Sequence, residues 1–135
     1  NLITPTVTVD PTDPMVMKNN RHPVTHTGIG YILDLFTRQR DRAVADKDFQ
    51  QVYHGVVPIM GRQTHKVEFI MPGKGKGYYC YRAEVYFDTE NKLPIRIVVY
   101  NWDDDLIERY SFRNLAINVG LTDDDFNPRS RAYNF

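Results

Sequence analysis

The sequence has few of the residues that mark several large protein classes. Its single cysteine, Cys80, excludes an internal disulfide. It has no excess of charge, because 17 basic residues balance 17 acidic ones. Domains that bind nucleic acid usually carry a basic excess, so we predict no nucleic-acid partner. No apolar run approaches the roughly 20 residues that cross a bilayer, so we predict that the chain does not span a membrane.

Residues suited to nucleophilic catalysis are also scarce. Ser111 and Ser130 are the two serines, and neither sits in a glycine-flanked elbow. Cys80 falls among tyrosines in a predicted strand, where a small buried side chain is expected. Glu68, Glu84 and Glu108 fall on predicted strands, and all three are expected on a solvated face. We therefore predict a protein that is not an enzyme and has no catalytic residues.

Signals for metals are weak. His22 and His26 are four residues apart, a zinc-binding spacing on a helix, but Pro23 between them opposes a helix there. The acidic triplets at 103–105 and 123–125 lack the alternating ligands and glycine of a calcium loop. We predict neither a metal site nor a cofactor.

The glycine-rich stretch GKGKG at 73–77 lacks the longer glycine spacing and the following Lys-Ser/Thr pair of a phosphate loop. It is expected to be a flexible basic loop, with Lys74 and Lys76 able to touch lipid headgroups.

One amphipathic helix is predicted. Ile29, Ile32, Leu33 and Phe36 follow the i, i+3, i+4, i+7 spacing of a single helix face. Thr25 or Thr27 is expected to cap this helix, which should run to about Asp46.

The remaining pattern mostly has a period of two. Strands are predicted at residues 2–10, 49–57, 66–71, 78–88, 93–102 and 106–119. Turns are predicted at 61–65 and 88–92, an ordered loop at 15–24, and a capped helical turn at 122–126. The order predicts an α+β fold: a curved antiparallel meander, or half-barrel, with one main helix on its concave face, in a single domain over residues 1–135.

An apolar stripe is expected on that concave face. Its candidate ligand-binding residues are Tyr53, Phe69, Tyr79, Tyr81, Val85, Phe87, Ile95, Ile97, Val99, Tyr110 and Phe112. They could form an ordinary core under the helix. However, one helix covers only part of such a sheet, so missing chain, a partner or an apolar ligand must cover the rest. On the ligand hypothesis, the concave face binds an acyl chain or an apolar polypeptide segment, as a carrier or a sensor would. Replacing Ile97 with Asp should then abolish lipid retention without loss of fold.

Three stretches resemble a known family. They are TVTVDPTDPMVMKNNRHPVTHTGIGYIL (6–33), DTENKLPIRIVVYNWD (88–103) and GLTDDDFNPRSRAYNF (120–135). Together they resemble the domain-of-unknown-function family numbered 1571, found mainly in exported bacterial proteins. The resemblance implies a LolA-like half-barrel that encloses an apolar cavity and binds a lipid or the acyl chain of a lipoprotein. It also implies a periplasmic or outer-membrane-associated location, and it transfers no catalytic residue.

The sequence departs from the family at its start. Family members normally have a helix and several strands before the point that corresponds to Asn1. We therefore expect residues 1–135 to be the C-terminal part of a longer half-barrel, with an exposed sheet edge near Thr6–Val9 that could receive a protein partner. The alternative function is an accessory subunit of a bacterial envelope complex, contacting partners through this edge and the Arg38–Arg42 helix end.

Overall fold

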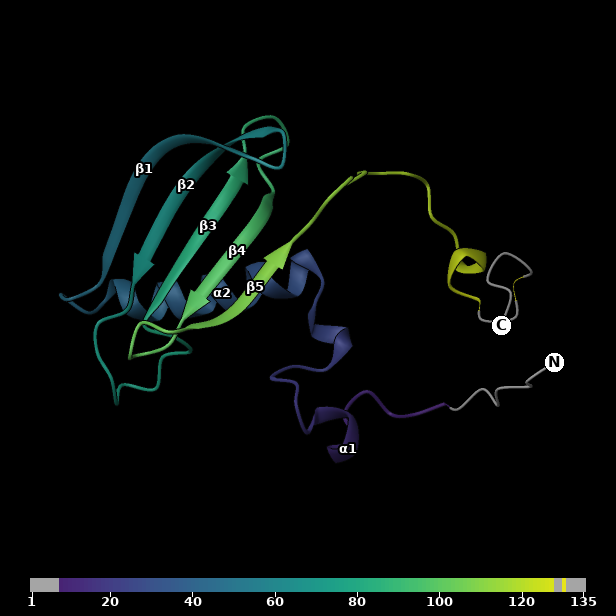
Figure 1. The fold of residues 1–135 in the computed structure, drawn as a ribbon, viewed down its shortest axis with the longest axis horizontal. Helices are drawn as coiled ribbons and strands as arrows, with labels where there is room; N and C mark the ends of the chain where they lie inside the picture. The colour runs from purple at the N-terminus through teal and green to yellow at the C-terminus, as the bar shows by residue number, and fades with distance from the viewer. Residues whose placement is uncertain (1–7, 128–129, 131–135) are drawn as a thin grey trace. The chain divides into compact units, whose positions relative to one another are not determined.

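The computed structural model describes residues 8–127 and residue 130, and Figure 1 shows its elements. In chain order these are α1 (Pro14–Met17), η1 (Val24–His26), α2 (Ile29–Val44), β1 (Gln50–Ile59), β2 (Arg62–Ile70), β3 (Arg82–Asp88), β4 (Pro94–Tyr100), β5 (Leu106–Ser111) and η2 (Asp123–Phe126). Residues 28–113 form one compact unit, which contains α2 and the whole sheet. The described parts of 1–27 and 114–135 belong to a second unit. The single domain over residues 1–135 stays a prediction.

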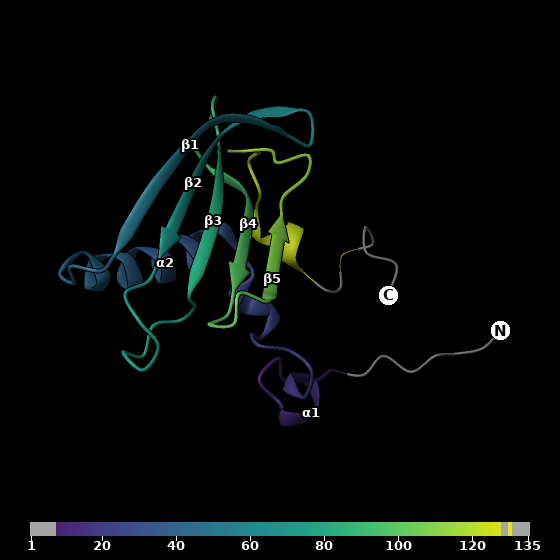
Figure 2. The same cartoon turned by 60° about the vertical axis from the view of Figure 1, so that its left-hand side comes forward.

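The sheet is a simple meander. Its five strands lie in the order β1-β2-β3-β4-β5, and each neighbouring pair is antiparallel. Figure 2 shows α2 lying across one face of this sheet. The predicted α+β class, with a curved antiparallel meander and one main helix, is confirmed.

Helix α2 packs through the face that the spacing predicts. Ile32 and Ala43 are buried, and Phe36 packs against the core. The cap differs from the prediction: Gly28 is the N-cap residue, and the Thr27 hydroxyl donates a hydrogen bond to the Val24 carbonyl instead. Because the N-cap position falls on glycine, no side chain caps the first turn of α2.

Three rows of cross-strand partners define the helix-facing side of the sheet, because directly opposed residues share a face. The first row is Gln51, Phe69, Ala83, Val99 and Glu108. The second row is Tyr53, Val67, Val85, Ile97 and Tyr110. The third row begins with Val56, His65 and Phe87.

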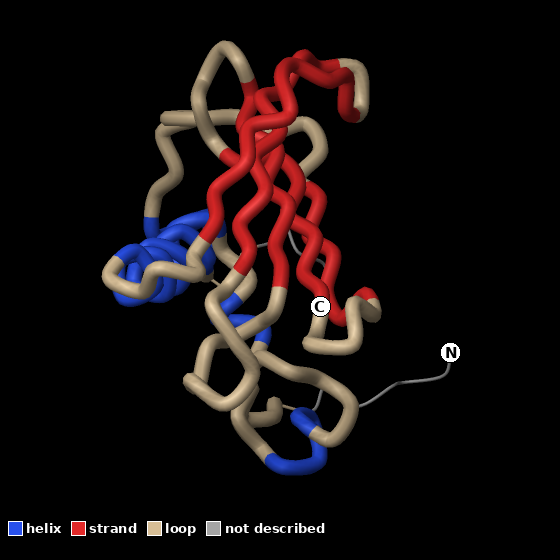
Figure 3. The backbone as a smooth tube through the Cα atoms, turned by 90° about the vertical axis from the view of Figure 1, so that its left-hand side faces the viewer, coloured by secondary structure: helices blue, strands red, loops and turns tan. Residues whose placement is uncertain are grey.

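The β1–β2 end of the sheet bends. The pairing register shifts between Tyr53 and Val56, and Gly55 in this irregularity has a φ of 84°. A β-bulge of this kind bends a strand, and glycine adopts a positive φ without steric cost. Figure 3 shows the hairpin end of β1 and β2 curving away from the helix. The third row of partners therefore lies where the sheet departs from α2.

Several predicted boundaries are wrong. The turn between β1 and β2 is at Met60 and Gly61, both with positive φ, so residues 62–65 belong to a strand and not to the predicted turn. β3 begins at Arg82 instead of residue 78, and β5 ends at Ser111 instead of residue 119. Because Asn114 and Asn118 have positive φ, the chain beyond β5 cannot continue as a strand.

The predictions for the N-terminal region have different outcomes. Residues 2–7 of the predicted first strand lie outside the described residues, whereas Thr8, Val9 and Asp10 form no strand. Within the described part of the chain, the sheet edges are therefore β1 and β5, and Thr8 and Val9 do not contribute to them. The predicted loop at 15–24 instead contains most of α1, whose first turn is capped by the Asp13 carboxylate. The helical turn predicted at 122–126 is confirmed as η2.

Asp88 organises the turn between β3 and β4. It is 1% exposed. Its Oδ1 accepts hydrogen bonds from the N–H groups of Glu90 (2.8 Å) and Asn91 (3.1 Å). Arg62 donates to both carboxylate oxygens. The Arg62 hydrogen bond, working against burial, lowers the pKa of Asp88.

Replacing Asp88 with Ala should destabilise the protein by about 2–4 kcal/mol, because two backbone N–H groups lose their acceptor and Arg62 loses the more buried of its two carboxylate partners, Asp88 and Glu90. Asp88→Asn keeps an acceptor oxygen and should cost about 1–2 kcal/mol. Because the folded-state pKa lies below the unfolded value of about 3.9, the stabilisation from ionised Asp88 is present above that value and is lost as the pH falls below it. Urea denaturation of the three proteins at pH 7 and pH 3 measures both effects. Equal stability of Asp88→Ala and wild type at pH 7 would contradict this role.

Candidate functional site

The part of the sheet under α2 is a closed core. The Phe36 ring meets the Phe69 ring edge-on at 4.7 Å between centroids, and the Phe49 ring stacks on Phe69 at 6.5 Å. Val85, Ile97 and Val99 belong to the same buried cluster. The predicted site residues Phe69, Val85, Ile97 and Val99 are thus packed against protein. Ile97 is 3% exposed, so its burial favours the opposite expectation, that Ile97→Asp disrupts the fold.

Three other predicted site residues lie at the margins of this core. Ile95 is buried beside the register shift between β3 and β4. Tyr79 donates a hydrogen bond from its hydroxyl to Glu108, and its backbone N–H lies 3.4 Å from the Gln39 side-chain oxygen of α2. Tyr81 lies beside Trp102, with 5.6 Å between ring centroids. Tyr79 thus connects the segment before β3 to α2 and β5, and Tyr81 packs this segment against Trp102.

Beyond the closed core, the same side of the sheet remains exposed. We name this region the open face and define it by Tyr53, Val56, His65, Phe87 and Phe112. Tyr53 is 59% exposed and Val56 is 51% exposed, whereas the other three are partly buried. Phe112 follows Tyr110 by two residues, and its N–H donates to Ile95 O at 2.9 Å, which continues the strand alternation. The open face therefore carries three aromatic side chains, one valine and one histidine.

Three predicted site residues belong to the open face: Tyr53, Phe87 and Phe112. Tyr110 lies in the adjacent row and packs against the core while remaining partly exposed.

Sequence reasoning missed Val56 and His65. The bulge at Gly55 changes the alternation along β1, which hides Val56, and the turn predicted at 61–65 removed His65 from the sheet. Gly55, a glycine inside the predicted strand 49–57, was the available signal for a bulge.

The open face contains one polar pair. The Tyr53 hydroxyl and His65 Nδ1 lie 2.9 Å apart, and their ring centroids are 5.9 Å apart. His65 lies between Val56 on β1 and Phe87 on β3 as their direct cross-strand partner. An imidazole thus sits inside an otherwise apolar surface.

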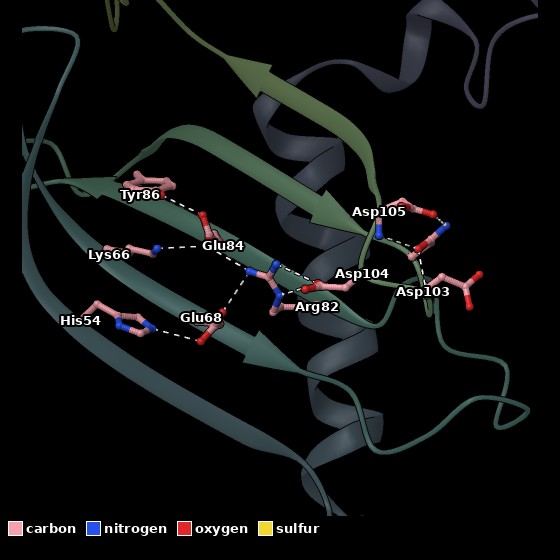
Figure 4. A network of polar contacts seen from close by, with 10 residues as sticks. His54, Lys66, Glu68, Arg82, Glu84, Tyr86, Asp103, Asp104 and Asp105 are labelled. Atoms are coloured by element: carbon pink, nitrogen blue, oxygen red, sulfur yellow. Dashed lines mark hydrogen bonds and ion pairs between the residues drawn. The ribbon is translucent and has the colours of Figure 1, made fainter.

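The opposite side of the sheet carries a charged network (Figure 4). At its centre, Arg82 donates to Glu68 (3.1 Å) and Glu84 (3.0 Å), and two of its nitrogens contact Asp104 Oδ1 at 3.0 and 2.8 Å. The Arg82 guanidinium also lies 3.7 Å from the centre of the Tyr100 ring.

The periphery of this network is paired as well. Lys66 donates to Glu84 at 3.0 Å, the Tyr86 hydroxyl donates to Glu84 at 2.8 Å, and His54 Nε2 lies 3.1 Å from Glu68. Burial acts against the charge on Glu84, but hydrogen bonds from Lys66 and Tyr86 prevail and lower its pKa. Burial likewise opposes the charge on Arg82, whereas Asp104 and Glu68 raise its pKa. The prediction that Glu68, Glu84 and Glu108 are solvated charges is wrong in different ways. Glu68 and Glu84 are largely buried and link β2 to β3 through Arg82, whereas Glu108 lies opposite Val99 on the helix-facing side and accepts a hydrogen bond from Tyr79.

The basic loop at 73–77 is anchored to α2. Arg42 donates to the Lys76 carbonyl and places its guanidinium 4.3 Å from the centre of the Tyr78 ring. The Lys76 ammonium pairs with Asp46, just after the helix. Arg38 pairs with Asp34 at 2.6 Å, so these basic side chains are engaged within the unit.

Two candidate catalytic residues, Cys80 and Ser111, are buried or hydrogen-bonded. Cys80 is buried in the core cluster, and the Ser111 hydroxyl accepts a hydrogen bond from Arg96 at 3.3 Å. Among the described residues, no three His, Cys, Asp or Glu side chains cluster in a way that could hold a metal ion. Across the same residues, no helix is sufficiently long and apolar to span a bilayer.

Comparisons with known proteins place the chain in context. The model of a family described as "Protein of unknown function (DUF1571)" matches residues 1–135. No curated protein matches significantly. One similar solved structure is a DUF1329 family protein from Desulfovibrio piger, with 21% identity and a TM-score of 0.40 over 46% of this chain and 25% of that one. Another is a putative outer membrane lipoprotein-sorting protein domain from Vibrio parahaemolyticus, with 15% identity and a TM-score of 0.45 over 53% of this chain and 30% of that one. The chain thus spans less than a third of either protein's length.

Proposed function

This chain belongs to the DUF1571 family of proteins of unknown function, and we propose that it binds an acyl chain, from a lipid or a lipoprotein, on its open face. The observation that carries this proposal is the contrast along one side of the sheet. Apolar side chains near α2 are closed in a core, whereas Tyr53 and Val56 are more than half exposed and Phe87 and Phe112 are only partly buried. The hairpin end of β1 and β2 curves away from the helix. Covering apolar surface contributes roughly 25 cal/mol per Å², which is enough to retain an acyl chain without many polar contacts.

The distribution of charge supports an apolar ligand. In the three rows of the helix-facing side, β1 to β4 contribute neither lysine nor arginine. Lys66 and Arg82 instead extend from the opposite side and are paired there with carboxylates. A polyanionic ligand would find no cation on these rows, so an acyl chain or another apolar segment fits them better.

The proposal includes a non-enzymatic role and an exported location. The buried Cys80 and the engaged Ser111 support the first part. The second part, a periplasmic or outer-membrane-associated protein, follows from the resemblance to exported bacterial proteins. Fractionation of the source cells tests the location separately from ligand binding.

Val56 and Val52 provide a matched test of the open face. Both valines are on β1, with exposures of 51% and 37%, but Val56 lies in the open face whereas Val52 opposes Glu68 on the charged side. Val56→Gln should weaken binding of a fluorescent acyl probe about fivefold, because the ligand loses roughly 1 kcal/mol of apolar contact. Val52→Gln should bind as wild type does.

Native mass spectrometry of the same proteins, purified from their own cells with gentle detergent release, provides a second readout. Retained lipid mass should decrease in Val56→Gln but not in Val52→Gln. Equal binding and equal retention in the two variants would contradict the open-face proposal.

One observation favours the alternative role of an accessory subunit. β1 is an edge strand of ten residues, QQVYHGVVPI, and it contains no Lys, Arg, Asp or Glu. Natural edge strands usually carry charges that prevent pairing with another chain, and β5 does so with Glu108 and Arg109. The bulge at Gly55 and Pro58 hinder pairing along the second half of β1. The first half of the β1 edge, Gln50–Tyr53, is thus the better candidate for strand addition by a protein partner. A native spectrum with bare protein found only in a multi-chain complex would favour this role over acyl binding.

A further inference from the structure

We propose that Tyr53 and His65 form a headgroup site that selects acyl ligands ending in a free carboxylate. This inference rests on the proposed binding of an acyl chain to the open face, and it specifies the class of ligand. Its basis is the 2.9 Å contact between the Tyr53 hydroxyl and His65 Nδ1 within an apolar surface.

The pair directs a hydrogen-bond donor outward. When the Tyr53 hydroxyl donates to Nδ1, a neutral His65 must carry its proton on Nε2. When His65 is protonated, Nδ1 donates to Tyr53 instead, and both Nε2–H and the tyrosine O–H become available as donors. Within the described residues, Tyr53 is the hydrogen-bond partner of this ring, which leaves Nε2 to meet a ligand. Both states suit an acceptor group, and the protonated state also supplies the charge that a carboxylate prefers.

The residues around His65 favour a ligand with one small, singly charged headgroup. Val56 and Phe87 flank His65 across the strands, and the rows of the helix-facing side contain no lysine or arginine on β1 to β4. A phosphate monoester or a multiply sulfated glycan carries more than one negative charge, whereas a monocarboxylate carries a single charge that one imidazolium can balance. Arg62 and Arg82 cannot contribute, because they pair with Asp88 and with Glu68, Glu84 and Asp104.

The rest of the open face receives the chain. Phe87 on β3 and Phe112 after β5 lie on the same side as His65 and pack against the core cluster. From β2 to β5 the sheet spans three inter-strand spacings, about 14 Å in total. An extended dodecanoate chain covers a similar distance. The ligand would therefore place its carboxylate at His65 and its alkyl chain across the strands toward Phe112.

Dodecanoate and dodecanol test this site, because they share an alkyl chain and differ at the headgroup. Displacement of a fluorescent apolar probe from the full chain gives both affinities. The wild type should bind dodecanoate about tenfold more tightly than dodecanol, as expected for a charge-assisted hydrogen bond. His65→Leu should reduce that preference to about twofold or less, with dodecanol affinity unchanged within about twofold.

His54→Leu is the matched control, since His54 lies on the adjacent strand but contacts Glu68 on the charged side. It should keep the tenfold preference. Tyr53→Phe retains the ring and removes only the hydroxyl, so it remains informative if circular dichroism shows that His65→Leu is misfolded. It should reduce the preference for dodecanoate by at least about threefold.

The outcomes separate the two proposals. Equal wild-type affinity for dodecanoate and dodecanol would overturn the headgroup site while leaving acyl binding supported. A preference that survives in both His65→Leu and Tyr53→Phe would also overturn it. Failure of both ligands to bind the wild type would instead overturn the proposed function, and the headgroup site with it.

Discussion

Replacing Ile97 with Asp is expected to unfold the unit that contains α2 and the sheet. Ile97 is 3% exposed and lies in the second row, between Val85 and Tyr110. A carboxylate there would lose its hydration without gaining a partner, and the apolar contacts of isoleucine would also be lost. Such a change costs at least about 4 kcal/mol, a large part of the 5–15 kcal/mol that stabilises a typical domain. We expect loss of the cooperative urea transition and strongly reduced soluble yield.

Ile97→Val is the control for this prediction. It removes one methylene without introducing charge and should cost about 0.5–1.5 kcal/mol, with a normal cooperative transition. If Ile97→Asp folded with nearly wild-type stability, the closed core under α2 would be wrong. Loss of acyl binding in Ile97→Asp would then say nothing about the open face, which is why Val56 and Val52 carry that test.

Replacing Arg82 with Met is expected to have the next largest effect. The Arg82 side chain is 16% exposed and contacts Glu68, Glu84 and Asp104. Methionine retains much of the apolar stem but leaves the two glutamates, which are themselves largely buried, without their shared cation. Breaking a fully buried pair costs about 3–5 kcal/mol, so we expect about 2–3 kcal/mol at this partly exposed site. For a unit of this size, the loss corresponds to a decrease in Tm of about 10–20 °C.

A second substitution can distinguish charge from packing. Combining Arg82→Met with Glu68→Gln removes one uncompensated carboxylate, so the double variant should recover about 1 kcal/mol relative to Arg82→Met alone. Calorimetry of the wild type, both single variants and the double variant completes the cycle. If the two substitutions were additive, the 3.1 Å contact between Arg82 and Glu68 would contribute no coupling.

These variants also test the roles of the two sides of the sheet independently. The charged network stabilises β2 and β3 from the side opposite α2, so Arg82→Met should lower stability without altering ligand preference at temperatures where it is folded. His65→Leu should alter the preference for dodecanoate without lowering stability. The proposed division between a bracing side and a binding side is therefore testable within one set of proteins.

The local sequence was sufficient for the main elements. The spacing of Ile29, Ile32, Leu33 and Phe36 predicts α2, because a helix face needs only residues three and four apart. The alternation of Val85 and Phe87 with Glu84 and Tyr86 predicts both sides of β3, because successive strand residues point to opposite faces. Such patterns are repeated over short distances and do not depend on the rest of the chain.

Positive φ angles account for several misplaced boundaries. The chain reverses at Met60 and Gly61, so residues 62–65 of the turn predicted at 61–65 belong to β2. Asn114 and Asn118 likewise interrupt an apolar alternation that otherwise suggests a strand up to residue 119. Methionine and asparagine do not reveal these conformations as reliably as glycine does, so a periodicity argument passes over them.

By itself, the sequence determined the α+β composition, the main helix and the apolar character of one sheet side, since these follow from local periodicity. The tertiary structure alone decided which of the predicted site residues are enclosed by α2 and which remain exposed. That division depends on where the helix crosses the sheet and on the bend at Gly55. It also brought His65 to Tyr53 and Arg82 to Glu68, because strand register joins residues that lie more than ten positions apart in the chain.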